Sequence, residues 1–240
     1  MAKFAALDAQ YLTDRRQHGD ADFWRTVDAF SLYCGIQTLG RVLALSSLLD
    51  RVRGVPGHIV ELGAWRGATT LLFAKWLHLF EPHSPKVVHA FDLWDEGFKA
   101  EQWTPQDNPA AASQYAGTYQ GNLEIIYQML ALYHLQDNVV LHQGRIEQTW
   151  PAFLMAEPGF KVSLALLDVD LYAPTYAALT GMHDRLSLGS LLIFDEYGHV
   201  DWPGETRAAD EFLATYPGCY TAETLPSVRQ PTLVLRRSAA

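Results

Sequence analysis

The chain has 240 residues, of which 49% are hydrophobic and 19% are charged, and its formal net charge is -9. This apolar content is too high for a disordered chain, and a domain of this size buries roughly 70–75% of its unfolded surface without needing disulfides. The acidic balance argues against a nucleic-acid partner, which requires a basic face. No apolar run reaches the roughly 18 residues that span a bilayer, and no secretory leader is evident. We therefore expect a cytoplasmic protein with no membrane partner.

Taken in chain order, the apolar pattern predicts a helical beginning followed by alternating strands and helices. Apolar residues recur at helical spacing through residues 1–56, and the Gly-Val-Pro-Gly turn at 54–57 ends this segment. Runs of β-branched and other apolar residues predict seven strands, at residues 58–62, 87–92, 139–143, 162–168, 191–194, 220–224 and 232–236. Helical spacing predicts the helices between them, at residues 69–80, 119–135, 174–186 and 205–216.

This alternation is typical of an α/β fold of the Rossmann-like kind, with a seven-stranded, mostly parallel sheet and helices on both faces. The last two strands have no helix between them, so we expect an antiparallel hairpin at the sheet edge. We expect residues 57–240 to form a single globular unit, with residues 1–56 as a helical cap. Residues 96–118 show no period, which is typical of a lid or a disordered loop.

The first predicted strand ends in a glycine turn that suits a ligand site. In an open α/β sheet, ligands bind beyond the carboxyl ends of the strands. Gly63 and Gly67 allow a tight turn and a close backbone approach before the following helix. The turn is not the G-x-G-x-x-G dinucleotide motif, and Asp92 follows Gly63 after about 29 residues rather than about 20. A nicotinamide enzyme is therefore disfavoured.

Acidic residues lie at the ends of the first two predicted strands, at Glu61 and Asp92. Together with the loose glycine turn they suit a ligand that has a cationic amino-acid part and a ribose but no phosphate, as S-adenosylmethionine has. Asp92 could accept hydrogen bonds from the ribose hydroxyls, and the backbone from Gly63 to Gly67 could line the methionine part. The alternative is that the glycines only turn the chain and that Asp92 only caps a helix.

A second group of acids follows the fourth and fifth predicted strands, with Asp168 and Asp170 after one and Asp195 and Glu196 after the other. Parallel strand ends can lie side by side, so these carboxylates would converge and repel one another. A hard cation such as Mg²⁺ relieves that repulsion. We assign Asp168, Asp195 and Glu196 to the metal and Asp170 to the general base. The alternative is that each acid caps a helix or is solvated.

Such a site could transfer a methyl group to oxygen. A metal lowers the pKa of a substrate hydroxyl, a free carboxylate takes its proton, and the oxygen then attacks the sulfonium methyl in line. His199, which follows the acid pair, is a second candidate for the base. Aromatic residues in or beside the 96–118 stretch could stack on a sugar or simply pack the lid onto the body; they are Trp94, Trp103, Tyr115 and Tyr119, with Trp202 in a later loop.

Several sequence blocks match one known pattern. Residues 55–67 read VPGHIVELGAWRG, and the later blocks at 143–151, 167–172, 194–198 and 207–212 read QGRIEQTWP, LDVDLY, FDEYG and RAADEF. Together they resemble the VPGDxVExGVWRGG, KGWFxxTLP, IDGDLY, VDDYG and RxAVDEF blocks of the macrocin O-methyltransferase family, relatives of the novobiocin and mycinamicin O-methyltransferases. Departures from the family pattern occur at Ala68, Ile146, Val169 and Glu196.

The resemblance implies a class I methyltransferase fold that uses S-adenosylmethionine and Mg²⁺, with a hydroxyl on a small molecule as the acceptor. It also implies a fuller set of cofactor-binding residues: Glu61, Gly63, Ala64, Trp65, Arg66, Gly67, Asp92, Leu93, Gly144, Arg145, Ile146 and Asp168. We therefore predict a Mg²⁺-dependent O-methyltransferase whose acceptor is a sugar-bearing natural product or polysaccharide. The open alternatives are a phenol or catechol acceptor and a non-catalytic partner subunit. The N-terminal helices could pair subunits into a homo-oligomer.

Overall fold

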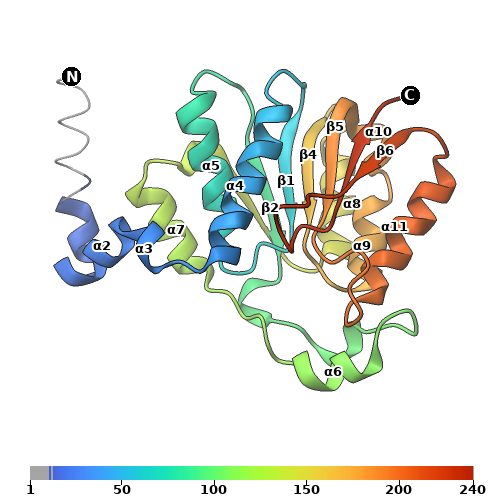
Figure 1. Cartoon of the computed structure of the whole chain (residues 1–240), viewed down its shortest axis with the longest axis horizontal. Coiled ribbons are helices and arrows are strands. Elements are labelled where there is room, and N and C mark those ends of the chain that lie inside the picture. The colour runs from blue at the N-terminus through green and yellow to red at the C-terminus, as the bar shows by residue number, and fades with distance from the viewer. Residues whose placement is uncertain (1–10, 12, 240) are drawn as a thin grey trace.

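The computed structural model describes residues 11 and 13–239, and within them seven strands form one sheet (Figure 1). The strand order is β3-β2-β1-β4-β5-β7-β6; pairing is parallel from β3 through β5 and antiparallel for β7 with both β5 and β6. The strands are β1 His58–Leu62, β2 Val88–Asp92, β3 Val139–Gln143, β4 Val162–Leu167, β5 Leu186–Phe194, β6 Tyr220–Glu223 and β7 Leu233–Arg237. The predicted sheet and its antiparallel edge hairpin are confirmed.

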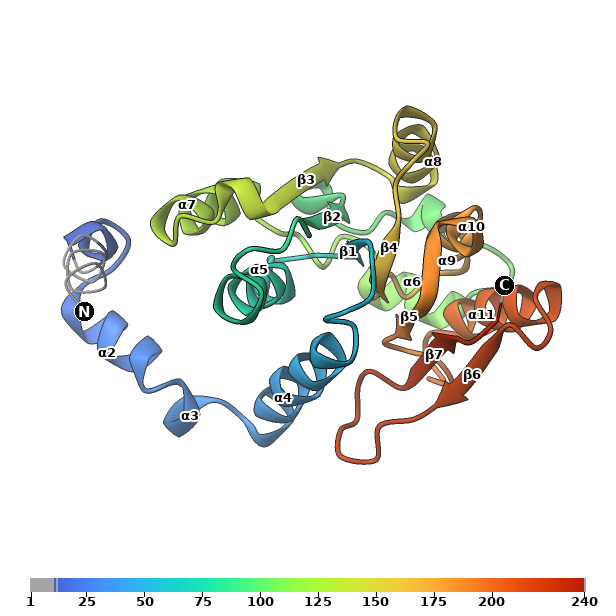
Figure 2. The ribbon, with the colours of Figure 1, turned by 90° about the horizontal axis from the view of Figure 1, so that it is seen from above.

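Helices cover both faces of this sheet (Figure 2). The α-helices are α2 Ala21–Asp28, α3 Phe30–Tyr33, α4 Ile36–Arg51, α5 Ala68–Phe80, α6 Pro109–Tyr115, α7 Leu123–Leu132, α8 Ile146–Ala156, α9 Tyr172–Leu179, α10 Met182–Arg185 and α11 Pro203–Thr215. Short 3-10 turns are η1 Arg15–Gln17, η2 Trp94–Glu96, η3 Ala100–Gln102 and η4 Gln136–Asn138. None of these helices has the length and apolar character that a membrane span requires.

The two hydrophobic cores follow from the alternation of side chains along each strand. In β1, Ile59 points into the core shared with α4, α5 and α7, whereas Val60 and Leu62 point into the core shared with α8, α9 and α11. The central strand β4 is buried along its whole length, so it reads as a nearly continuous apolar run instead of an alternating one. This two-sided burial holds the strand ends at one rigid edge.

Two predicted helices have different bounds in the structure. The predicted helix over 174–186 ends at Leu179, because Gly181 adopts a left-handed φ of 77° and starts the separate short helix α10. Residues from Leu186 onward already belong to β5, which is longer than predicted. The predicted helix over 119–135 begins only at Leu123, since Tyr119 has a φ of 59° that a helix cannot contain.

The 96–118 stretch, which we call the lid, is a folded segment that contains η3 and α6. Asp107 fastens it to the body: one carboxylate oxygen accepts a hydrogen bond from the backbone N–H of Tyr172 at 2.7 Å, and the other accepts from Thr104. A small apolar core joins the lid to the loops after β4 and β5; its members are Ala111, Leu171 and Trp202, with Phe98, Trp103 and Tyr115 packed against them. Trp103, Tyr115 and Trp202 thus pack the lid onto the body.

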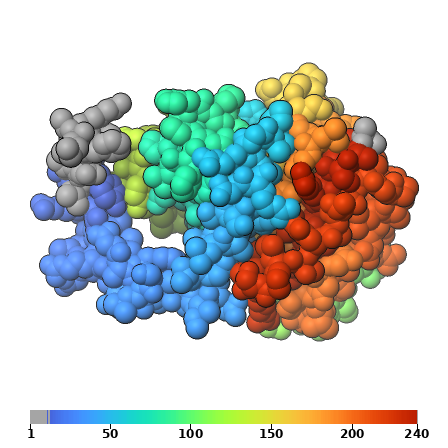
Figure 3. Space-filling model, turned by 45° about the horizontal axis from the view of Figure 1, so that its top comes forward, coloured from blue at the N-terminus to red at the C-terminus, as the bar shows by residue number. Residues whose placement is uncertain are grey.

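The N-terminal helices differ in how they meet the sheet. Helix α4 packs on it through Leu45, Leu48 and Leu49, all fully buried. Helices α2 and α3 lie at one end of the molecule, beyond α4 and α5 (Figure 3). This end carries exposed apolar side chains, at Phe23, Val27, Phe30, Leu32, Tyr33 and Ile36. Pairing of subunits through these helices stays a prediction, and the predicted helix over the first ten residues lies outside the described part of the chain.

Three histidines from neighbouring strands gather on one face of the sheet. His89 Nδ1 and His142 Nε2 are 3.1 Å apart, so one ring donates a hydrogen bond and the other accepts it. His58 accepts a hydrogen bond from the backbone N–H of Val87 and stacks on Phe160. Burial, with a smaller contribution from the neighbouring histidines, lowers the pKa of His89 to about 3, and burial lowers that of His142 to about 4. The folded protein therefore keeps this cluster neutral.

We expect the free energy of unfolding to fall as the pH drops below about 6.5, because the unfolded chain then protonates His89 and His142 and the folded chain does not. The loss continues down to the folded pKa values of about 4 and about 3 and approaches about 1.4 kcal/mol per pH unit for each histidine. Urea unfolding at pH 7.5 and pH 5 measures it. A His89→Leu/His142→Leu double variant should lose less stability between these two pH values; an unchanged difference would contradict the assignment.

Candidate active site

A cavity of about 510 Å³ opens at the carboxyl ends of the parallel strands, which is a typical volume for a small-molecule site. Its lining comes from the loops after β1 to β5, from α4 and from the lid. Nearly all the residues that the sequence predicted for cofactor, metal and base line this one cavity: Glu61, Gly63, Ala64, Trp65, Arg66, Asp92, Leu93, Gly144, Arg145, Ile146, Asp168, Asp170, Asp195 and Glu196. Gly67 and His199 do not line it.

The glycine turn brings the ends of β1 and β4 into direct contact. Gly63 has a φ of 92°, and a Cβ atom there would overlap the backbone carbonyl of Asp168. Gly67, with a φ of 74°, precedes the first residue of α5, and a Cβ there would press on the side chain of Ile126. Both positions therefore need glycine, and the turn lets the loops after β1 and β4 share one wall of the cavity.

Asp92, at the end of β2, holds two loops of the cavity in place. Its Oδ2 accepts a hydrogen bond from the backbone N–H of Trp65 at 2.8 Å, and its Oδ1 accepts from that of Trp94 at 2.5 Å. Burial raises the pKa of Asp92, and these backbone hydrogen bonds oppose the rise. Trp65 and Trp94 have left-handed φ values of 45° and 50°, which are strained for side chains of this size. The carboxylate of Asp92 lies in the lining of the cavity.

Glu61, on β1, is a buried carboxyl group on the same side of the cavity. The hydroxyl of Thr70 in α5 donates a hydrogen bond to it. Burial raises the pKa of Glu61 to about 8, against the opposing effects of Thr70 and Arg41. The group is therefore largely protonated at neutral pH, and a cationic ligand beside it would favour the charged form.

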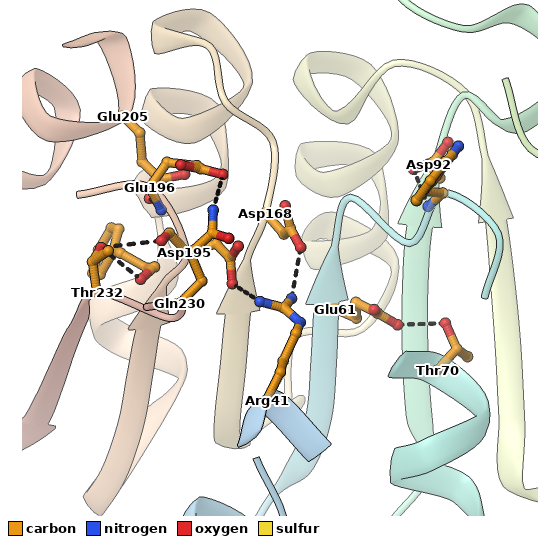
Figure 4. A network of polar contacts seen from close by, with 12 residues as sticks. Arg41, Glu61, Thr70, Asp92, Asp168, Asp195, Glu196, Glu205, Gln230 and Thr232 are labelled. Atoms are coloured by element: carbon orange, nitrogen blue, oxygen red, sulfur yellow. Dashed lines mark hydrogen bonds and ion pairs between the residues drawn. The ribbon is translucent and has the colours of Figure 1, made fainter. Parts of the chain in front are cut away.

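The four acids after β4 and β5 line the same cavity, and Figure 4 shows that an arginine lies between two of them, Asp168 and Asp195. Arg41, from α4, donates from Nη2 to Asp168 Oδ2 at 2.8 Å and from Nη1 to Asp195 Oδ1. Burial raises the pKa of Asp168 well above its usual range, and the neighbouring Asp195 raises it further, while Arg41 opposes both. The sequence analysis missed Arg41. Its position in the sequence was a clue, because Arg41 lies four and seven residues before Leu45 and Leu48, on the same face of the predicted helix.

Glu196 belongs to the same cluster, and only one of its carboxylate oxygens has a hydrogen-bond partner among the described residues. The side chain of Gln230 donates to its Oε1, whereas its Oε2 is buried without a hydrogen-bond partner among the described residues. Burial, then repulsion from Asp195, raises the pKa of Glu196 to about 7. Behind it, Oε1 of the fully buried Glu205 accepts a hydrogen bond from the backbone N–H of Glu196 at 2.8 Å. The sequence analysis missed both residues: Gln230 comes 34 positions after Glu196, and Glu205 comes 9 positions after it, within the predicted helix over 205–216.

The chemistry of this cluster fits a hard divalent cation, although its arrangement is not a finished metal site. Carboxylate oxygens are the ligands that Mg²⁺ prefers, and the buried Oε2 of Glu196, which has no hydrogen-bond partner among the described residues, is the kind of atom that a cation would satisfy. Across residues 11 and 13–239, however, no three His, Cys, Asp or Glu side chains are grouped so that they could hold a metal. Arg41 takes one oxygen each from Asp168 and Asp195.

Asp170 and the lid face one another across the cavity. Asp170 is buried and has a left-handed φ of 62° at the turn after β4, and burial raises its pKa well above the usual range. Tyr119 also lines the cavity; burial, followed by the charge of Asp170, raises the pKa of its hydroxyl to about 12. Its ring contacts those of Trp65 and Phe98, with centroids 5.7 and 5.3 Å away. Aromatic rings and carboxylates thus line the same cavity.

His199 lies behind the acids rather than in the cavity. Its Nδ1 accepts a hydrogen bond from the backbone N–H of Asp201 at 3.3 Å and lies 4.0 Å from Glu196 Oε2. Between the two candidates for the base, only Asp170 faces the cavity.

We expect Gly63→Ala to destabilise the fold by roughly 3 kcal/mol or more, because the new methyl group combines a strained φ with an overlap on the Asp168 carbonyl. Gly218→Ala is the matched control: its φ is 77°, yet a Cβ there meets no atom within 4 Å, so it carries only the strain. Urea unfolding of both variants measures the difference. An equal loss of unfolding free energy in both variants would show that the overlap with the Asp168 carbonyl adds nothing to the strain.

Comparison with curated proteins finds similar sequences among O-methyltransferases. The chain is 28% identical over 145 residues to the 8-demethyl-8-(2,3-dimethoxy-alpha-L-rhamnosyl)-tetracenomycin-C 4'-O-methyltransferase of Streptomyces olivaceus, covering 60% of this chain and 54% of that one. It is 26% identical over 151 residues to the mycinamicin III 3''-O-methyltransferase of Micromonospora griseorubida, covering 60% and 56%. The chain thus matches little more than half the length of these relatives.

The fold is also similar to a solved structure along nearly the whole chain. The apo structure of CalS11, described as a TDP-rhamnose 3'-O-methyltransferase of calicheamicin biosynthesis, superposes with a TM-score of 0.71 at 25% identity and covers 96% of this chain and 93% of its own. A family model described as macrocin O-methyltransferase (TylF) matches residues 8–216, most of the chain. The chain therefore belongs to the macrocin O-methyltransferase family.

Proposed function

We propose that this protein is an O-methyltransferase that moves a methyl group from S-adenosylmethionine to a hydroxyl of a sugar-bearing small molecule. One observation carries the proposal: a single cavity contains both the strand-end acids suited to the donor and the acidic cluster suited to a hydroxyl acceptor. The class of acceptor is supported by the names of two similar proteins, which contain a rhamnosyl group and TDP-rhamnose. Membership of the family supports the same reaction.

The donor half of the cavity would hold S-adenosylmethionine, which supplies a methyl group on a sulfonium when it is bound. The buried carboxyl of Glu61 would balance the positive charge of the amino-acid part. Asp92 would accept hydrogen bonds from the ribose hydroxyls, and the loop from Gly144 to Ile146 would border the adenine. The backbone turn at Gly63 lines the cavity and would lie beside the methionine chain at the end of β1.

The acceptor half would bind and deprotonate the hydroxyl. Asp170 would take the hydroxyl proton as the acceptor oxygen forms its bond to the methyl carbon and the carbon–sulfur bond breaks, so proton, methyl group and charge are all accounted for. The rings of Phe98 and Tyr119 would form a wall against which a sugar face can stack, and the lid would exclude water. The contribution of the chain is then mainly to position the two reactants.

The proposal extends to Mg²⁺, which Asp168, Asp195 and Glu196 would hold. A bound Mg²⁺ supplies a Lewis acid that lowers the pKa of a hydroxyl beside it. The buried Oε2 of Glu196, which has no hydrogen-bond partner among the described residues, supports this extension. A phenol is the second candidate for the acceptor, because the Phe98 and Tyr119 rings suit an aromatic ring as well as a sugar face.

We expect S-adenosylmethionine to bind with release of a proton at pH 7. Free Glu61, with a pKa of about 8, is mostly protonated, and a cationic ligand facing it lowers that pKa and drives the proton off. Calorimetry in phosphate and in Tris, which differ in ionisation enthalpy, measures the release. Glu61→Gln should abolish the release and weaken binding about tenfold or more, whereas Glu124→Gln, on the exposed face of α7, should change neither. A lack of binding at millimolar ligand would refute the donor assignment.

We expect methyl transfer to a sugar-bearing acceptor to be detectable by mass spectrometry in a screen of glycosylated natural products, nucleotide sugars and phenols. Asp170→Asn should lower kcat by about a hundredfold or more while leaving the affinity for S-adenosylmethionine unchanged, because it removes only the proton acceptor. EDTA, Asp168→Ala and Asp195→Ala should each abolish turnover. Full turnover in EDTA would refute the Mg²⁺ extension, and methylation of phenols alone would favour the second acceptor class.

A further inference from the structure

Arg41 places a fixed positive charge between the two strand ends that carry the acidic cluster (Figure 4). Its guanidinium bridges Asp168 and Asp195, which lie 127 and 154 positions further along the chain. Asp195 is only 5% exposed at its side chain and Arg41 is 24% exposed, so bulk water screens this contact little. The bridge is therefore a stronger interaction than an ordinary surface ion pair.

The packing of α4 on the sheet fixes the position of Arg41 and therefore of this bridge. Four and seven residues after it come Leu45 and Leu48, both buried against the sheet, so Arg41 extends the sheet-facing stripe of the helix. The apolar contacts of α4 thus hold the base of the arginine over the strand ends. The planar fork of the guanidinium can then donate to two carboxylates at once, which a lysine ammonium does less well.

The oxygens that Arg41 uses belong to residues that would hold the metal. Two of the three expected ligands, Asp168 and Asp195, each give an oxygen to the guanidinium. The third, Glu196, keeps a buried oxygen with no hydrogen-bond partner among the described residues. A guanidinium and a divalent cation cannot share these carboxylates closely, because both are positive and both need the same lone pairs. One of them must move away for the other to bind fully.

We propose that Arg41 and a divalent cation compete for Asp168 and Asp195. Arg41 holds the acidic cluster together in the metal-free protein and sets how tightly the metal binds. This inference deepens the proposed function, since it concerns the same acids that would face the acceptor hydroxyl. It makes Arg41 a positioning residue that acts on the carboxylates and not on the reacting atoms.

Binding of Mn²⁺ to the full chain without donor or acceptor tests the competition directly. Electron paramagnetic resonance counts free Mn²⁺ in a titration of the unaltered protein, of Arg41→Met and of Arg51→Met. Arg41→Met keeps the length of the side chain but removes the charge, so we expect Mn²⁺ to bind about tenfold tighter or more, because no buried ion pair has to be displaced. Arg51→Met removes an arginine from the same helix, one paired with the distant Glu223, and should leave the affinity unchanged.

Thermal unfolding gives a second readout that does not depend on turnover. Metal-free Arg41→Met should melt below the unaltered protein, because two crowded carboxylates lose their counter-ion, and saturating Mn²⁺ should raise its Tm by more than it raises that of the unaltered protein. Arg41→Lys covers the case in which the methionine variant fails to fold. Its compact ammonium can pair with one carboxylate at a time, so its affinity for Mn²⁺ should lie above that of the unaltered protein.

Equal or weaker Mn²⁺ binding in the Arg41 variants would overturn the inference, as would the absence of Mn²⁺ binding in every variant. Calorimetry with S-adenosylmethionine on the same samples separates these results from the proposed function. A protein that binds the donor but shows no competition keeps the proposed methyl transfer and loses only the role of Arg41. A protein that shows the competition for Mn²⁺ but does not bind the donor keeps the role of Arg41 and loses the proposed methyl transfer.

Discussion

The crowding of buried carboxylates after β4 and β5 is the constraint on which the rest of the site depends. Charged carboxylates repel one another and lose hydration on burial, so each must be protonated, paired or hydrogen-bonded. The fold gives four of these acids a specific polar partner. Asp168 and Asp195 share the guanidinium of Arg41, Glu196 receives a hydrogen bond from Gln230, and Glu205 accepts one from the backbone. Helix α4 and the loop that carries Gln230 are therefore both tied to the strand ends by this charge.

The order of the strands explains why donor and acceptor groups meet in one cavity. Because β1 lies between β2 and β4, the glycine turn after β1 has Asp92 on one side and Asp168 on the other. The absence of a side chain at Gly63 lets the turn lie against the carbonyl of Asp168. Under the proposed function, the acids assigned to the donor and those assigned to the acceptor hydroxyl would be neighbours across a single backbone turn. In-line methyl transfer needs this closeness, because the acceptor oxygen and the methyl carbon must be held near each other and aligned.

The sequence predicts those parts of the molecule that local patterns encode. Strand and helix periods and the acids at strand ends depend on neighbours in sequence, and the sheet and the convergence of the predicted residues followed from them. Three features depend on distant contacts and were missed or misplaced. The helix over 174–186 breaks at Gly181, because the following residues extend β5. Glu205 reaches the cluster from α11, and Arg41 reaches it from α4. A charge at the sheet-facing position before Leu45 and Leu48 was a usable clue, because a buried helix stripe seldom contains an unpaired arginine.

The helical cap takes on a different meaning once Arg41 is placed. The helical spacing of apolar residues predicted residues 1–56 as a cap, and α2 and α3 carry exposed apolar side chains that leave this part free for other contacts. Helix α4 is different, since it lines the cavity and supplies the only arginine that bridges the acids among the described residues. The net charge of the chain is -9, and two of its acids, Asp168 and Asp195, are paired with the positive charge of Arg41. If Arg41 and a cation compete as proposed, a cation that enters the cluster must displace a group anchored on α4, and metal binding would then be coupled to the packing of this helix through one side chain.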